Sequence, residues 1–372
     1  MNAMNLLPAI LIGGPPHSGK SVLAYSLSQA LRSRNVPHYL MRAAPDGEGD
    51  WSQEMDEARM NAIRFKGPWN ERWVNVVCRD LAARPMPLLV DVGGKPTPEQ
   101  YVIFDQCTGA ILLTRDDAAA DQWRRIVTSR GLPIIADLRS VLAGEGALWP
   151  AVNGELRGVV SGLQRGRAPA SGPAFDALVE RLATIFAFSQ EELTHMHMAS
   201  APEDARVVNF DELARQRYPN DPQHRFVEAD VDAVLDGVPA TEPIAAYGRI
   251  PAWLATALGA RCNLRWQFDV RLGWVRTPCF AMCNPGKAPT NPWLAFRITE
   301  VGPGRVQLDA SKRQYYLDYQ ALDGLPVPHI PSTAHVTING PDTSGGGLPL
   351  WVFAALGHVY RGCAGVQVQQ MR

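Results

Sequence analysis

The chain has 372 residues and a net charge of −1, with 46% hydrophobic and 20% charged residues. This length and composition predict two or three folded domains, and the near-zero charge argues against binding to long polyanions. No apolar run approaches the ~20 residues of a membrane-spanning helix, and the cysteines are scattered, so we expect a cytoplasmic protein with reduced thiols and no membrane partner.

The first predicted elements are a buried strand over 8–12 and a helix over 21–31. Between them lies the sequence GPPHSGKS at 14–21, which matches the pattern GxxxxGK[ST]. A glycine-rich loop between a strand and a helix points backbone N–H groups and the positive end of the helix at an anion. The sequence therefore predicts a phosphate-binding loop.

Four residues of this loop have predicted roles. Gly14 and Gly19 provide backbone freedom and allow the ligand to approach closely, where a side chain would block it. Lys20 is expected to reach the β- and γ-phosphates of ATP, and the hydroxyl of Ser21 to bind Mg²⁺. The predicted cofactors are therefore ATP and Mg²⁺.

A second apolar strand at 87–92 contains Asp91, and Asp-x-x-Gly runs from there to Gly94. In proteins with a phosphate-binding loop, a carboxylate at the end of such a strand associates with Mg²⁺. We therefore predict that Asp91 and Ser21 form the metal site.

Two further candidates lie in the same half of the chain. Asp46 and Glu48 belong to an acidic segment after the second strand, where a kinase would hold its phosphoryl acceptor, and either could be an acceptor base. A solvated acidic turn explains them equally well. Arg124 and Arg125 could clamp phosphates, although paired arginines on a helix are more often surface charge.

Strands at 38–42, 110–114 and 133–137 and a closing helix at 175–188 complete the first half. Alternating strands and helices predict an α/β fold, here a doubly wound, mostly parallel sheet of five strands. We place this nucleotide-binding domain at 1–198.

The second half contains an internal repeat. Segments 248–259 and 349–357 share Pro, Trp, Ala, Leu and Gly at identical spacing, and each lies between two short predicted strands. The sequence thus predicts two tandem α+β modules, at 206–285 and 290–372.

The two copies differ where chemistry is expected. After Ala-Leu-Gly, the second copy has His358 where the first has Ala260. The first copy ends its last strand with Asp269 and Arg271, whereas the second ends with Arg372 at the chain terminus. Neither copy therefore holds the histidine, the aspartate and the arginine together.

The pattern strand, Gly-x-x-Pro-x-Trp, helix, His-x-Tyr, strand, Asp-x-Arg resembles the CRISPR-associated ring nucleases of type III systems, some of which are fused to a P-loop ATPase domain. The resemblance spans the last ~165 residues, with the domain order reversed. It implies cleavage of cyclic oligoadenylate, in particular cyclic tetra-adenylate, Mn²⁺ dependence, and sites shared between protomers, hence a homo-oligomer. Carried over, the catalytic residues are His358, Asp269 and Arg271, with Arg372 as the counterpart of Arg271.

These residues allow more than one hypothesis. His358 from one module and Asp269 with Arg271 from the other could form one composite site, or His358 could be a packed helix residue and the other two a surface ion pair. A competing hypothesis makes the first domain a small-molecule or nucleotide kinase and the second half a nucleotide sensor. A third makes the protein a non-catalytic nucleotide binder or scaffold.

Overall fold

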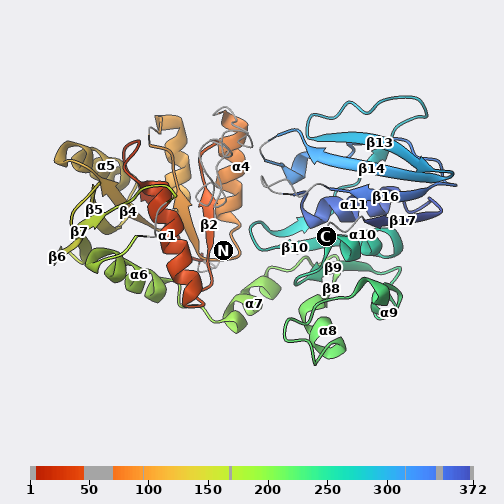
Figure 1. The fold of residues 1–372 in the computed structure, drawn as a ribbon, viewed down its shortest axis with the longest axis horizontal. Helices are drawn as coiled ribbons and strands as arrows, with labels where there is room; N and C mark the ends of the chain where they lie inside the picture. Colours follow the sequence, from red (N-terminus) through yellow and green to blue (C-terminus); the bar gives the residue numbers. More distant parts are fainter. Residues whose placement is uncertain are drawn as a thin grey trace. The chain divides into compact units, whose positions relative to one another are not determined.

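The computed structural model of the chain describes residues 6–45, 70–94, 96–166, 170–314, 316–340 and 347–368. The chain forms two compact units, Met1–His197 (unit 1) and Met198–Arg372 (unit 2), which Figure 1 colours from red to green and from green to blue. Each unit has its own hydrophobic core.

Unit 1 is built on a seven-stranded sheet in which all neighbours are parallel except the last pair, β7 and β6. In spatial order the strands are β2 (Tyr39–Arg42), β3 (Leu88–Asp91), β1 (Ala9–Gly13), β4 (Gly109–Thr114), β5 (Ile134–Val141), β7 (Glu155–Ser161) and β6 (Ala147–Val152). The α/β class is confirmed. The strands β1, β3 and β4 are buried throughout, as their continuous apolar sequences predict.

The prediction of five strands was wrong because it omitted the hairpin of β6 and β7. The turn is Asn153-Gly154, with φ of 53° and 79°. Asn-Gly with two positive φ values is a strong hairpin signal, but β6 is an exposed edge strand that contains Pro150 and lacks the alternation of apolar and polar residues typical of a strand.

Helices cover the sheet of unit 1. They are α1 (Lys20–Ser33), α4 (Glu71–Ala82), the 3-10 helix η1 (Pro98–Gln106), α5 (Asp117–Ser129), α6 (Pro173–Ile185) and α7 (Gln190–Ala199), whose last two residues belong to unit 2. The helices α1 and α6 share one core with Ile10 and Ile12 of β1. Asn70 and Asp116 begin α4 and α5 as side-chain caps, accepting from the backbone N–H three residues on.

Unit 2 contains two four-stranded sheets of related topology. One has the order β11 (Gly273–Arg276), β10 (Asn263–Asp269), β9 (Pro243–Tyr247), β8 (Arg206–Asn209). The other has the order β13 (Leu294–Gly302), β14 (Arg305–Lys312), β16 (His335–Asn339), β17 (Gly365–Val368), and a two-stranded sheet joins β12 (Ala281–Met282) to β15 (Pro326–Val327). In each large sheet three strands are parallel and one antiparallel strand is added, beside β10 in the first and beside β14 in the second.

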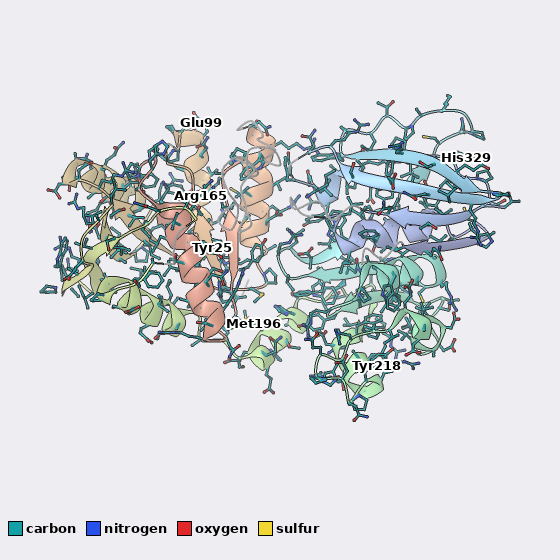
Figure 2. The ribbon with its side chains drawn as sticks, viewed as in Figure 1. Tyr25, Glu99, Arg165, Met196, Tyr218 and His329 are labelled. Atoms are coloured by element: carbon teal, nitrogen blue, oxygen red, sulfur yellow. The ribbon has the colours of Figure 1, made fainter. Side chains whose placement is uncertain are left out.

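The helices of unit 2 are α8 (Phe210–Arg217), the 3-10 helix η2 (Glu228–Asp230), α9 (Val231–Leu235), α10 (Ala252–Arg261), the 3-10 helix η3 (Tyr319–Ala321) and α11 (Leu350–Val359). Figure 1 shows α10 and α11 between the strands of the two large sheets. Around α8, the hydroxyl of Tyr218, labelled in Figure 2, donates to Asp230 (2.9 Å). One core contains the inward side chains of both sheets and both central helices, so the two predicted modules are not separate domains.

The two central helices contact each other through equivalent positions of the repeat. A Cβ atom added to Gly259 would lie 2.0 Å from the carbonyl oxygen of Ala354, and one added to Gly357 would lie 2.1 Å from that of Thr256. Gly259 and Gly357 are equivalent in the repeat, as are Thr256 and Ala354. The repeat therefore folds with approximate two-fold symmetry, and its glycines permit the helix backbones to touch.

In the part of the chain that the structure describes, no helix combines the length and apolar character needed to span a bilayer.

Candidate nucleotide-binding sites

The phosphate-binding loop joins β1 to α1. Gly14 has a φ of 152° and Gly19 a φ of 93°. A Cβ atom on Gly14 would lie 2.0 Å from the carbonyl oxygen of Leu113, so a larger residue cannot occupy this position. Lys20 lies back over its own loop, and its Nζ donates to the carbonyl oxygen of Pro15 (2.8 Å). The lysine is thus held on the loop that would surround the phosphates.

The strand order brings Asp91 beside this loop. Asp91 is the last residue of β3, which lies next to β1 and pairs Asp91 with Ile12. On its other side β3 pairs with β2, and Asp91 is in register with Arg42. Because the strands are parallel, their carboxyl ends lie at one edge of the sheet, where open α/β sheets bind ligands.

Arg42 connects the two predicted metal ligands. Its Nη1 donates to the hydroxyl of Ser21 (2.6 Å) and forms an ion pair with Oδ2 of Asp91. Asp91 is buried, with 3% of its surface exposed, so its carboxylate needs this positive partner. Oxygens of Ser21 and Asp91 therefore converge on one point, and at that point they already hold a cationic group.

This arrangement fits Mg²⁺. The ion prefers oxygen ligands and is usually held by one or two carboxylates or hydroxyls together with substrate phosphates and water. Ser21 and Asp91 supply one hydroxyl and one carboxylate. Elsewhere in the described ranges, no group of three His, Cys, Asp or Glu side chains could hold a metal ion.

The charges around Lys20 favour an anionic ligand. The pKa of Lys20 is lowered to about 8. Burial is the largest cause, Asp91 opposes it, and the positive charges of Arg42 and Arg115 add to the lowering. Three cationic side chains therefore face one carboxylate. A bound polyphosphate would remove this excess of positive charge and favour the protonated lysine.

A second loop packs on the first. The segment 91–94 follows β3, and a Cβ atom on Gly94 would lie 2.4 Å from the backbone nitrogen of Pro16 and 2.6 Å from its Cα. The glycine predicted to end the Asp-x-x-Gly segment therefore contacts the backbone of the phosphate-binding loop, which it supports.

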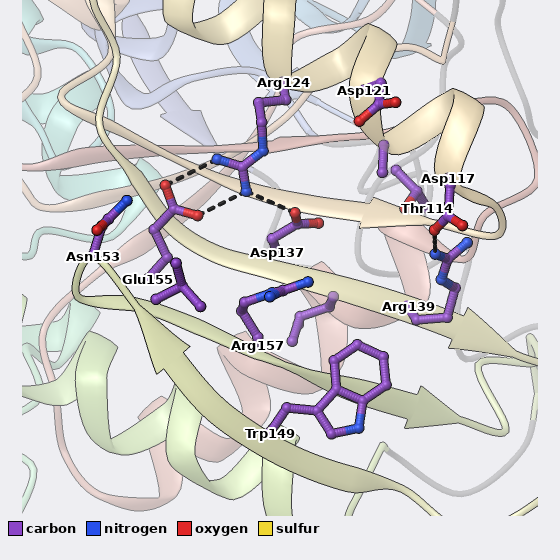
Figure 3. A pocket seen from close by; sticks show the side chains of 13 residues that line it. Thr114, Asp117, Asp121, Arg124, Asp137, Arg139, Trp149, Asn153, Glu155 and Arg157 are labelled. Carbon is purple, nitrogen blue, oxygen red and sulfur yellow. Dashed lines mark hydrogen bonds and ion pairs between the residues drawn. The ribbon is translucent and has the colours of Figure 1, made fainter.

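The predicted phosphate clamp, Arg124, lies elsewhere. It donates two hydrogen bonds to Glu155 (2.7 and 3.0 Å) and one to Asp137 (2.8 Å), in a pocket of about 350 Å³ formed by α5 and β5 to β7 (Figure 3). These carboxylates raise its pKa. Arg124 is mid-helix on α5, away from the carboxyl edge, and two carboxylates occupy its guanidinium. These ion pairs use the donors with which Arg124 would clamp a phosphate.

In unit 2, Asp269 and Arg271 lie together at the carboxyl end of β10. Asp269 Oδ1 accepts from the backbone N–H of Arg271 (2.8 Å) and lies 3.5 Å from its Nε. Arg271 also acts on Lys312, the last residue of β14. Burial lowers the pKa of Lys312, and the charge of Arg271 lowers it further. The positive charge of Arg271, just after the carboxyl end of β10, therefore acts on Lys312 at the carboxyl end of β14.

His358 lies near the start of β10, whereas Asp269 lies at the end of this strand. His358 is near the C-terminus of α11, beside the backbone of Gly259, which opposes the lowering of its pKa by burial and by Arg361. Gly259 is near the end of α10, shortly before β10 begins. Asp269 ends β10, whose seven residues span about 20 Å. Within one chain, His358 and Asp269 thus lie at opposite ends of β10, which disfavours the composite site.

Sequence reasoning missed Arg42, Arg115 and Lys312. Arg42 is the last residue of one predicted strand, and Arg115 directly follows another. Because the carboxyl ends of parallel strands meet at one edge of the sheet, their positions could have predicted that they lie near the phosphate-binding loop. Lys312 had no such signal, because its strand was not predicted. The predicted residues Asp46, Glu48 and Arg372 lie outside the described residues.

No family model matches this chain, and no curated protein matches it significantly. Its function must therefore be argued from the geometry.

Proposed function

We propose that unit 1 is a P-loop domain that binds ATP with Mg²⁺, and that unit 2, as a pair of ring-nuclease-like modules, binds and cleaves a cyclic oligoadenylate. The observation that carries the first half is the convergence of Lys20, Ser21 and Asp91 at one edge of the sheet. Lys20 would bind the β- and γ-phosphates, and Ser21 and Asp91 would hold Mg²⁺, which neutralises phosphate charge when bound.

The proposal that unit 2 binds a cyclic oligoadenylate rests on the charge and symmetry of this unit. The charge of Arg271, just after β10, acts on Lys312 at the carboxyl end of β14 and lowers its pKa. Neighbouring cations destabilise each other, and an anion between them removes that cost. A cyclic oligoadenylate carries one negative phosphodiester per nucleotide and has rotational symmetry of its own. The two central helices of unit 2 contact each other with approximate two-fold symmetry, which suits a symmetric ring.

The proposed reaction is attack of a ribose 2′-hydroxyl on the adjacent phosphorus. The new O–P bond yields a 2′,3′-cyclic phosphate, and the bond to the 5′-oxygen breaks. A base removes the 2′ proton, and an acid returns a proton to the 5′-oxygen. Arg271 would stabilise the charge on the phosphorane, and Asp269 holds the backbone of Arg271 in place.

His358 is the proposed acid or base, contributed by a second copy of the chain. Inside one chain His358 and Asp269 are separated by the length of β10. Burial and Arg361 lower the pKa of His358, which keeps the imidazole neutral near pH 7, as a base requires. This proposal therefore includes a homo-oligomer with shared sites.

The test is chromatography of cyclic tetra-adenylate after incubation with the protein, with and without Mn²⁺ and ATP. We expect linear products from the wild type and none from His358→Ala or Arg271→Ala. Arg276→Ala, which removes an exposed arginine of β11 that pairs with Asp323, is the matched control and should leave cleavage unchanged. Equal cleavage by wild type and Arg271→Ala would contradict the proposal.

A mixing experiment tests the shared site. His358→Ala and Arg271→Ala are each expected to be inactive, but an equimolar mixture should recover part of the activity, because some interfaces combine intact residues from both copies. An inactive mixture, with both variants folded and assembled as the wild type, would exclude sharing between copies.

A second candidate function is phosphoryl transfer by unit 1. Arg42 and Arg115 add two cations beside Lys20, as the charge of a transferring phosphoryl group requires. Phosphorylation of a small molecule that persists in His358→Ala and is lost in Lys20→Ala would favour this kinase function. Saturable binding of both ligands without turnover would favour a scaffold.

A further inference from the structure

Arg42 lies where a metal ion would be expected. Its guanidinium donates to Ser21 Oγ (2.6 Å) and to Asp91 Oδ2, the same two oxygens that fit Mg²⁺. The guanidinium and the metal ion cannot both fill the space between these oxygens. Only 16% of the Arg42 side chain and 3% of the Asp91 side chain are exposed, so this contact is largely protected from solvent.

The contact is determined by the sheet. Arg42 ends β2, Asp91 ends β3, and the parallel register pairs them directly, from Tyr39 with Leu88 to Arg42 with Asp91. Ser21 lies in the first turn of α1, on the other side of the guanidinium. Three elements that are distant in sequence thus hold the arginine between the two oxygens.

We propose that Arg42 is an internal substitute for the divalent cation of unit 1: it pairs with Ser21 and Asp91 in the nucleotide-free protein, and Mg²⁺ must displace it. This inference rests on the proposed ATP site. A buried carboxylate without a cation is costly, and exchanging the guanidinium for Mg²⁺ keeps Asp91 paired in both states. The planar fork of a displaced arginine suits bidentate contacts with phosphate oxygens, so Arg42 would act as a positioning residue for the nucleotide.

The consequence is competition. Divalent metal binds only after the two contacts of Arg42 are broken, so the apparent metal affinity of the wild-type protein is reduced. Removing the guanidinium should therefore tighten metal binding. A merely structural ion pair predicts the opposite, because losing Arg42 would disorder Asp91 and weaken the metal site.

The experiment titrates Mn²⁺ into the nucleotide-free full chain and follows free Mn²⁺ by electron paramagnetic resonance, so no turnover is needed. The variant is Arg42→Gln, which removes the guanidinium and its charge but keeps a polar side chain, and circular dichroism checks its fold. We expect the midpoint for Mn²⁺ to fall about tenfold, the effect of one charge-assisted hydrogen bond. A midpoint that is unchanged or higher overturns the proposal.

Arg115→Gln is the matched control. Arg115 also lowers the pKa of Lys20 through its charge, but among the described residues it forms no hydrogen bond or ion pair with Ser21 or Asp91. Its removal should therefore change the midpoint by less than about threefold, as for an exposed charge. Equal shifts of the Mn²⁺ midpoint in Arg42→Gln and Arg115→Gln would mean that the loss of any nearby positive charge explains the effect. That result would overturn the proposal. If wild-type protein binds no ATP in a separate calorimetric titration, the proposed ATP site itself fails, and this inference fails with it.

Discussion

Single residues at tight contacts are where the chemistry of unit 1 is most sensitive. Gly94 touches the backbone of the phosphate-binding loop, Arg42 bridges two oxygens expected to bind metal, and His197 is buried at the end of the unit. A different property matters at each residue. At Gly94 it is the space for a side chain, at Arg42 the positive charge, and at His197 the protonation state.

Gly94→Ala is expected to weaken ATP binding at least about tenfold while leaving the unit folded. The added methyl carbon would lie 2.4 Å from the backbone nitrogen of Pro16, so the phosphate-binding loop must shift. Calorimetric titration with ATP and Mg²⁺ measures the affinity. Gly302→Ala, which meets no atom within 4 Å, is the control. Wild-type affinity in Gly94→Ala would show that the loop tolerates the shift.

His197 should make the stability of unit 1 depend on pH. Its Nε2 lies 2.6 Å from the carbonyl oxygen of Pro85, and burial lowers its pKa while that hydrogen bond partly opposes the change. A lowered pKa in the folded state means that the unfolded chain binds the proton more readily. The free energy of unfolding is then greatest above the unfolded pKa, near 6.5, and decreases as the pH falls below it.

The measurement is the urea midpoint of unit 1 between pH 7.5 and 5.5, for wild type and His197→Gln. Glutamine can keep the donor to Pro85 but does not titrate in this range. We expect a steeper loss of stability on acidification in the wild type than in the variant. Parallel pH profiles of the urea midpoint would mean that His197 does not contribute to the pH dependence of stability.

At the scale of elements, the contact between α10 and α11 is the defining feature of unit 2. The sequence repeat predicts two similar helices, each with a glycine at the same position. It does not predict that these glycines face the other helix, because that depends on how the two sheets pack on a shared core.

Gly259→Ala and Gly357→Ala should each destabilise unit 2 by about 1–3 kcal/mol or more, the usual effect of overpacking a core. Each added methyl carbon would lie within 2.1 Å of a backbone carbonyl oxygen on the opposite helix, and a backbone cannot move aside as a flexible side chain can. Denaturant unfolding measures the effect. Gly362→Ala, with no atom within 4 Å, should stay within about 0.5 kcal/mol of wild type. Similar values for all three variants would contradict the close helix contact.

At the scale of the whole molecule, the two units have separate cores. The core of unit 1 forms around β1, α1 and α6, and that of unit 2 around α10, α11 and both sheets. Two cores predict that unfolding is not a single two-state transition.

Calorimetry of the full chain should resolve two unfolding transitions. ATP with Mg²⁺ should raise the midpoint of one of them, because a ligand stabilises only the unit that binds it, by about 2.7 kcal/mol at a hundredfold excess over Kd. In Lys20→Ala that shift should disappear while both transitions remain. A single transition shifted as a whole by ATP would show that the units unfold together.

Sequence alone determined the local features of this protein. The strand, loop and helix around Lys20, with Gly14 and Gly19 in positive φ, follow from residues close together in the chain, and so do the buried strands of unit 1 and the repeated helices of unit 2. These features depend on apolar periodicity and backbone conformation, which are properties of short segments.

Tertiary structure alone decided which distant residues meet. The register of β2 on β3 placed Arg42 against Asp91, and the packing of α5 on β5 and β7 occupied Arg124 with carboxylates. In unit 2, the fold brings the charge of Arg271 to act on Lys312. The same packing separated His358 from Asp269. The physical reason is that strand order and helix contacts are chosen by burial over the whole unit, so a side chain's partners are not written in its neighbouring residues.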